Sequence, residues 1–188
     1  MDKIYQIKIQ LLGIDPPIWR RFVVPSGLPL IDFHKVIQTM MGWQNYHLHQ
    51  FIKDNKYYLP KMKDDWTWED ETNVDTKGLN VSDILKVENE EIIYEYDFGD
   101  SWGHLVVLEN IADNLNGLKK PFCLEGERNC PPEDCGGFPG YENLLEILSD
   151  PDHEEYESYL EWLGGEYDPE LFSEKKVNGR LKRMKFGG

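Results

Sequence analysis

Residues 92–108 read IIYEYDFGDSWGHLVVL, and this stretch decides the fold because it predicts a β-hairpin. Apolar and aromatic residues flank the turn-forming residues Gly99-Asp100-Ser101 on both sides. A loop centred on the middle residue of this turn would place His104 opposite Tyr96, whereas a two-residue loop would place it opposite Glu95. The sequence leaves these two registers open, and with them the face of the sheet on which His104 lies.

The sequence before this hairpin predicts two strands, a helix and a third strand. Polar and apolar residues alternate in the strand segments, whereas the helical segment has apolar residues at a spacing near the helical period and ends at Gly42. This order is that of a β-grasp-like ββαβ core, which is an analogy of fold only. The predicted ranges are 5–11 and 18–24 for two strands, 31–41 for the helix, and 47–52 for the third strand, with a continuation over 57–59.

The sequence after these elements is less regular. A polar loop is expected over 61–78 and a short helix over 83–87, capped by Ser82. Residues 121–141 are rich in Pro, Gly and Cys, which indicates an irregular loop. Further helices are expected near 141–149, 153–163 and 169–183.

These elements predict an α+β fold, with a mainly antiparallel sheet, a packed helix and a C-terminal helical segment. The whole chain, 1–188, is expected to form one domain, because its length lies within the usual range for a single domain. We expect a strand-rich part over 1–112, the loop over 121–141 and a helical part over 141–183.

The chain is strongly acidic, and its acidic residues are concentrated in two segments. It has 188 residues, with 20 Lys and Arg against 35 Asp and Glu, which gives a net charge of −15. Residues 61–100 hold 4 basic and 13 acidic residues, and residues 125–170 hold 1 and 15. Residues 1–60, with 7 and 4, and the tail 171–188, with 6 and 1, are basic. Because phosphate contacts with Lys and Arg dominate nucleic-acid affinity, we expect no specific nucleic-acid partner.

The composition also excludes several other classes of protein. The 6 Trp, 10 Tyr and 8 Phe are too many for a disordered chain, so we expect a soluble globular protein. No apolar run approaches the roughly 18–20 residues that span a bilayer, and the first residues, MDKIYQ, lack the order of a secretory signal. We therefore expect a cytoplasmic location and no membrane partner.

Three cysteines form the first candidate for chemistry. Cys123, Cys130 and Cys135 lie in the Gly/Pro-rich loop, and disulfides are not expected in a chain without a secretory signal. Three thiols and a fourth ligand, His104 first and Asp134 second, would suit zinc or another divalent metal. The spacing is not that of a zinc knuckle, and the alternative is three reduced, packed cysteines without a cofactor.

Histidines and carboxylates in three segments form the second candidate. His47 and His49 are two residues apart, so on a strand both imidazoles face the same side and can converge on one site. Such a pair suits a metal ion or acid–base catalysis, although ordinary hydrogen-bonded histidines give the same pattern. We predict that the segments around 47–49, 97–104 and 130–137 line one cleft, with Trp43 or Trp102 in its wall. The alternative is that each segment stabilises only its own turn. The candidate residues are His47, His49, Asp97, Asp100, His104, Glu133 and Asp134.

Four motifs resemble the plasmid pRiA4b ORF-3-like family, whose members are also described as passenger proteins of an insertion element. They are PIWRRF at 17–22, MGW at 41–43 with HLHQF at 47–51, YEYDFGDSWGH at 94–104 and CPPEDCGG at 130–137. The resemblance extends over roughly 5–180. The family name records a gene neighbourhood, so the resemblance implies no reaction.

Some members of this family carry a resolvase-like label, which the residues of this chain do not support. A serine recombinase needs a nucleophilic serine with arginines around the phosphate. Ser101 follows Asp100 in an acidic hairpin without nearby arginines, and Arg20 and Arg21 face opposite sides of a strand. We therefore exclude recombinase chemistry.

The sequence favours a binding module with an acidic, aromatic groove for an unknown protein or small-molecule partner. The alternative is a metal-dependent hydrolase, acting for example on phosphoesters, because carboxylates near histidines suit a divalent ion. That alternative would use His47, His49, Asp97, Asp100 and His104.

Overall fold

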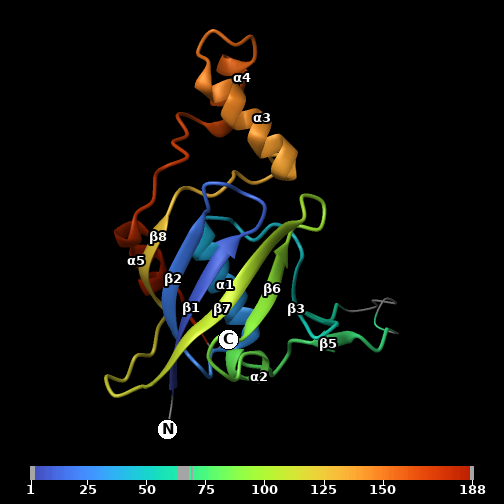
Figure 1. Ribbon diagram of the computed structural model, residues 1–188, viewed down its shortest axis with the longest axis vertical. Helices are drawn as coiled ribbons and strands as arrows, with labels where there is room; N and C mark the ends of the chain where they lie inside the picture. Colours follow the sequence, from blue (N-terminus) through green and yellow to red (C-terminus); the bar gives the residue numbers. More distant parts are fainter. Residues whose placement is uncertain (1–2, 63–67, 69, 187–188) are drawn as a thin grey trace.

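The computed structural model describes residues 3–62, 68 and 70–186, and it is built around an eight-stranded sheet (Figure 1). The order of the strands across the sheet is β5-β4-β3-β6-β7-β1-β2-β8. The strands are β1 (Lys3–Leu11), β2 (Trp19–Pro25), β3 (His49–Lys53), β4 (Lys56–Leu59), β5 (Asn73–Asp75), β6 (Glu91–Tyr96), β7 (Trp102–Asp113) and β8 (Phe122–Glu127). The helices are α1 (Leu30–Met41), α2 (Val81–Ile84), α3 (Gly137–Ser149), α4 (Tyr156–Leu163) and α5 (Glu174–Arg183).

The predicted α+β class with a mainly antiparallel sheet is confirmed. All neighbouring strands pair antiparallel except β4 and β5, which are parallel. The chain order strand, strand, helix, strand is the predicted one, but β6 and β7 lie between β1 and β3 in the sheet. The long hairpin of residues 92–108 therefore forms the centre of the sheet rather than an addition to its edge.

The core lies between the sheet and α1, which runs behind the sheet in Figure 1. Alternate residues of β1, from Tyr5 to Leu11, are buried on the helix side, as the period of two requires. Phe33 of α1 lies between two strand residues, with ring centroids 5.6 Å from Phe51 and 6.3 Å from Phe22. Each such side chain stabilises the fold by about 1.5–3 kcal/mol through burial.

The hairpin has neither of the two registers considered from the sequence. Tyr94 pairs with His104 and Tyr96 pairs with Trp102, so the connection spans residues 97–101. Asp97 and Ser101 take left-handed backbone conformations at its two ends, with φ of 57° and 56°. This five-residue loop shifts the pairing, so His104 shares the buried face with Tyr94.

Three segments differ from the elements expected there. Residues 122–127 of the expected irregular loop form β8, which completes the sheet beside β2, and α3 begins at Gly137 rather than near 141. The short helix α2 is capped by Asn80 and not by Ser82, because Asn80 and Asp83 bond each other's backbone N–H groups. Residues 73–75 of the expected polar loop form β5, and residues 63–67 and 69 of that loop lie outside the described residues.

The basic tail is part of the fold and not a free arm. Helix α5 packs against β8 and α1 with Val177 and Leu181 buried. Ser173 caps its N-terminus by accepting a hydrogen bond from the Lys176 N–H. The last turn holds three basic side chains, where the helix carbonyls favour cations. No helix within the described residues is long and apolar enough to cross a membrane.

The two adjacent arginines of β2 face opposite sides of the sheet, as expected. Arg21 forms ion pairs with Glu109 and Glu125 on the partly exposed face. Arg20 is 2% exposed, lies 4.0 Å from the ring of Phe172, and donates hydrogen bonds to backbone carbonyls. Those carbonyls belong to Trp19, Met40, Glu127 and Arg128. Arg20 therefore joins α1, β2 and the chain after β8, and it is not available to a phosphate.

Candidate functional site

Three segments meet at the tip of the β6–β7 hairpin and bring one imidazole next to three carboxylates. His47 Nε2 lies 3.0 Å from Asp134 Oδ1, 3.6 Å from Asp97 Oδ2 and 3.9 Å from Glu133 Oε2. His47 precedes β3, Asp97 follows β6, and the other two residues lie between β8 and α3. We call these four residues the His47 cluster.

Tyr96 holds two of these segments in place. Its hydroxyl accepts a hydrogen bond from the Tyr46 N–H at 3.0 Å and donates to Glu133 at 3.2 Å. Glu133 also accepts a hydrogen bond from the Gln44 N–H at 2.7 Å. Burial and the neighbouring Glu133 raise the pKa of Tyr96 to about 12, so the phenol keeps its proton and remains a donor.

Asp100 lies beside the cluster and fixes the loop before α3. Its Oδ2 accepts a hydrogen bond from the Gly136 N–H at 3.2 Å. Gly137 follows with a φ of 67°, and a Cβ at this position would lie 2.9 Å from the Asp100 carbonyl oxygen. This close approach requires glycine and attaches the hairpin tip to the start of α3.

Aromatic rings line the inner side of the cluster. Trp43 stacks on Tyr96 with ring centroids 5.0 Å apart and lies 6.1 Å from Trp102. Its indole N–H donates to the Pro131 carbonyl at 2.9 Å. The Trp43 side chain thus joins the end of α1 to the proline-rich loop.

His49 and His104 do not join His47. The strand begins only at His49, so the alternation of a strand does not extend back to His47, which lies in a bend. His49 stacks on His34 with ring centroids 3.4 Å apart. His104 is fully buried, packs edge-on against Trp43, and its Nδ1–H donates to the Tyr94 carbonyl at 3.2 Å. Burial lowers the pKa of His49 to about 3 and that of His104 to about 4, so both are neutral at pH 7.

His34 is a buried histidine that the sequence analysis did not single out. Its Nε2 lies 2.6 Å from the amide oxygen of Asn45, which can only accept, so Nε2 carries the proton. Its Nδ1 then accepts a hydrogen bond from the Tyr94 hydroxyl at 2.8 Å, and Gln38 donates to the same hydroxyl at 3.0 Å. The i, i+4 spacing of His34 and Gln38 on the buried side of the helix was the sequence signal for this network.

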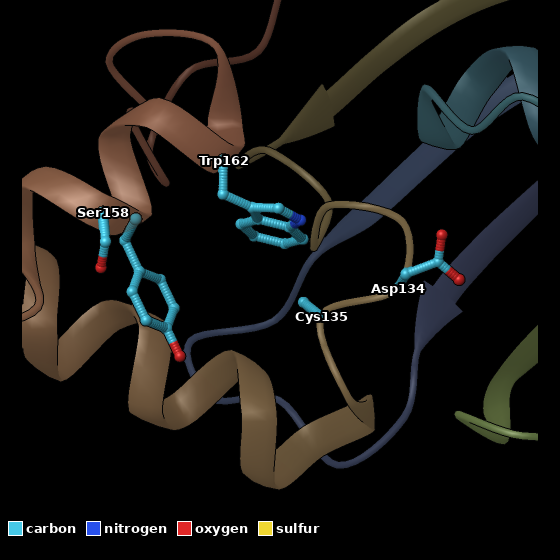
Figure 2. Close-up of a pocket in the computed structure, with 5 residues that line it drawn as sticks. Asp134, Cys135, Ser158 and Trp162 are labelled. Atoms are coloured by element: carbon cyan, nitrogen blue, oxygen red, sulfur yellow. The ribbon is translucent and has the colours of Figure 1, made fainter.

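A groove lies on the other side of the Pro131–Cys135 loop, between this loop and α4. It consists of two adjoining hollows of about 320 Å³ and 430 Å³, and Trp162 lines both. Figure 2 shows Trp162 projecting from α4 toward the loop, while the Asp134 carboxylate points away from the indole. The groove is also lined by Tyr159, Leu163, Pro132, Glu133 and Arg180.

The sequence profile of the plasmid pRiA4b ORF-3-like protein family matches residues 3–176. The chain belongs to this family. It is 35% identical over 178 residues to a protein of Sinorhizobium fredii (strain NBRC 101917 / NGR234) named uncharacterized protein y4hQ, covering 93% of this chain and 89% of that protein. It is also similar to the crystal structure of MM3350 from Methanosarcina mazei Go1, titled a protein of unknown function. The TM-score is 0.84 at 40% identity, over 94% of this chain and 98% of the other.

In this pRiA4b ORF-3-like protein, the geometry of the described residues gives no support to the candidate zinc site of three cysteines with His104. Cys123 and Cys130 are buried, and within the described part of the chain no group of potential metal ligands includes a thiol. The Cys130 Sγ lies 3.5 Å from the Arg20 guanidinium and 3.8 Å from the Met41 sulfur, so its neighbours are structural groups. All three thiols are free.

We expect these thiols to react slowly in the folded protein. Burial raises the pKa of Cys123 and Cys130 to about 11 and that of Cys135 to about 12. The thiolate is the nucleophile, so alkylation by iodoacetamide at pH 8 should be about 100-fold slower than in denaturant, or slower still. Mass spectrometry of timed samples measures the rates. Fast native alkylation, or a Cys130–Cys135 disulfide in protein trapped from cells, would contradict this expectation.

Proposed function

We propose that this pRiA4b ORF-3-like protein is a protein-binding module, and that the groove between α4 and the Pro131–Cys135 loop binds a basic segment of a partner. The observation that carries this proposal is the incomplete burial of the side chains of α4. None of its residues is fully buried: Tyr159 and Leu163 are only partly covered by the core, Trp162 is 48% exposed, and all three line the groove. A helix normally buries an apolar stripe, and a partner segment in the groove would cover this one.

Charge favours a basic occupant. Eight acidic residues lie between 142 and 161, and none of them forms an ion pair with any residue that the structure describes. One basic side chain, Arg180, lines the groove. Electrostatic complementarity raises association rates and excludes acidic partners, so lysine- or arginine-rich segments are the expected ligands.

The aromatic lining supplies the apolar part of the interaction. Trp162 is 48% exposed and lies between the two hollows, where a partner side chain would contact it from either side. Tryptophan is enriched among the residues that dominate interface energies, and its indole face also attracts cations. We therefore regard Trp162 as the main anchor of the groove.

The hydrolase alternative gains no support from the geometry. Of its five proposed groups, only His47 and Asp97 belong to the His47 cluster. Asp100 bonds the backbone before α3, and His49 and His104 are neutral core residues. We do not propose a catalytic reaction.

A defined peptide tests the groove. We expect a fluorescein-labelled decapeptide of alternating lysine and leucine to bind at about 150 mM salt in the presence of EDTA, and its glutamate counterpart not to bind. Trp162→Ala should weaken binding at least about tenfold, measured by fluorescence anisotropy. Phe122→Ala is the matched control, because Phe122 is 49% exposed on β8 and lines neither of the two hollows.

Three results would contradict the proposal. Equal binding of the lysine and glutamate peptides would remove the charge argument. Equal loss of affinity in Trp162→Ala and Phe122→Ala would indicate nonspecific adsorption. Binding of small aromatic compounds with no peptide binding would indicate a ligand pocket instead.

A further inference from the structure

We infer that His47, Asp97 and Asp134 form a binding site for one divalent transition-metal ion, which no part of the proposed peptide-binding function requires. Each residue offers one ligand atom, and these atoms lie within 4.8 Å of one another. The three ligands come from the bend before β3, the β6–β7 loop and the loop before α3. A bound ion would therefore join three segments that are far apart in the sequence.

The first argument is an unpartnered buried nitrogen. His47 Nε2 is buried and has no hydrogen-bond partner, although Asp134 Oδ1 lies only 3.0 Å away. The two atoms are close but not aligned as donor and acceptor, so a proton on Nε2 would not point at the carboxylate. Ligand atoms around a metal are likewise close together without being hydrogen-bonded, because each is directed at the ion and not at its neighbour.

The second argument is uncompensated charge. Asp97, Glu133 and Asp134 surround one imidazole, and no Lys or Arg of the described residues lies within ion-pair distance of any of them. The side chain of Asp97 is only 10% exposed. Buried carboxylates are normally paired or coordinate a metal, so a divalent cation is the missing partner.

The third argument is geometry. Ligands bonded to zinc at about 2.1 Å in a tetrahedral site lie about 3.4 Å from one another. The two distances from His47 Nε2, 3.0 Å to Asp134 and 3.6 Å to Asp97, lie on either side of that value. The present arrangement can thus accept an ion with only small side-chain movements.

The surroundings hold the ligands and leave a route for the ion. Asp97 Oδ1 accepts a hydrogen bond from the Gly99 N–H at 3.0 Å, which leaves Oδ2 directed at His47. The Asp134 side chain is 65% exposed and provides the open side. Glu133, fixed by Tyr96 and Gln44, adds negative charge beside the ligands. Hydrogen bonds of this kind orient ligands and increase metal affinity.

The ligand set also indicates the class of metal. Imidazole nitrogen with carboxylate oxygens suits zinc and other first-row transition ions, whereas calcium and magnesium prefer sites made only of oxygen. We therefore expect Zn²⁺ to bind, and Ca²⁺ and Mg²⁺ to bind at least about 100-fold more weakly.

The test uses the full chain, freed of metal with EDTA and then dialysed. Titration with Zn²⁺ in a calorimeter should give one site per chain. Saturating Zn²⁺ should raise Tm by at least about 5 °C. The ring ¹⁵N signals of His47 should shift on titration, which identifies the ligand directly. His47→Gln and Asp134→Asn should each weaken binding at least about tenfold.

His153→Gln is the matched control, because it removes an imidazole from an acidic segment outside the cluster and should leave the affinity unchanged. Circular dichroism and Tm without metal show whether each variant is folded, and Asp134→Asn changes only an exposed side chain. The inference is wrong if folded wild-type protein binds no Zn²⁺, if both cluster variants keep full affinity, or if Ca²⁺ binds as tightly as Zn²⁺. None of these three results depends on the peptide assay, which is run in EDTA.

Discussion

Lowering the pH from 7 to 4.5 is expected to remove most of the stability of this protein. His34, His49 and His104 are buried and neutral in the folded state, where burial lowers the pKa values to about 4, about 3 and about 4. In the unfolded chain each histidine titrates near 6.5. Acid therefore protonates the unfolded state first.

The direction and the size of this pH dependence follow from the difference between the folded and unfolded pKa values. The folded pKa values are depressed, so the stabilisation is complete above pH 6.5 and is lost as the pH falls toward about 4. Each histidine contributes a slope of about 1.4 kcal/mol per pH unit in this window, or about 4 kcal/mol per pH unit for the three. Over two units this approaches the whole stability of an ordinary domain, about 5–15 kcal/mol.

Urea unfolding at several pH values between 7 and 5, in EDTA, measures this slope. His104→Asn removes one titrating group while its amide can still donate to the Tyr94 carbonyl, which accepts from His104 at 3.2 Å. This variant should reduce the slope by about a third, whatever its stability at pH 7. A free energy of unfolding that stays constant between pH 6.5 and 5 would show that the three histidines are not buried as neutral groups.

Replacing Gly140 by alanine is expected to destabilise the protein by about 3 kcal/mol or more. Gly140 lies in α3, and a Cβ there would be 1.7 Å from the Cys135 carbonyl oxygen and 2.7 Å from its carbon. Both are backbone atoms, so no side-chain rotation relieves the overlap. The Pro131–Cys135 loop would have to move, and Glu133 and Asp134 would move with it.

Gly179→Ala is the matched control, since Gly179 also lies within a helix, α5, but a Cβ there would have no neighbour within 4 Å. Alanine should stabilise that helix by about 1 kcal/mol, because glycine is the poorer helix former. Chemical denaturation compares the two variants with the wild type. If Gly140→Ala were as stable as Gly179→Ala, the contact between α3 and the loop would not exist as described.

The period of hydrophobic residues was sufficient to predict most of the fold. Alternation identified β1, β2 and the two strands of the hairpin, and helical spacing identified α1, because these patterns arise from the local geometry of strand and helix. The edge strand β8 was missed because its sequence, FCLEGE, contains a glycine and lies in a Pro/Gly-rich segment. Pairing with β2 decides its conformation, and pairing is not a local property.

The sequence predicted the segments and residue types of the candidate site, but not which of the candidate residues come together. The motifs pointed to seven residues in three segments, and the structure brings His47, Asp97, Glu133 and Asp134 together. His49 and His104 were indistinguishable from His47 in the sequence. Only the start of β3 and the hairpin register place these two in the core.

The sequence by itself determined the secondary structure of the hairpin, its acidic surroundings and the residue types at its tip. The tertiary structure alone decided which of these residues face one another. A register shift of one residue moves a side chain to the other face of a sheet, and here a five-residue loop with left-handed Asp97 and Ser101 sets that register. The loop conformation depends in turn on the contact of Asp100 with Gly136 and Gly137, residues some 36 positions later in the chain. Contacts between such distant segments lie outside any local pattern, so the burial of His104 and the assembly of the His47 cluster follow only from the folded chain.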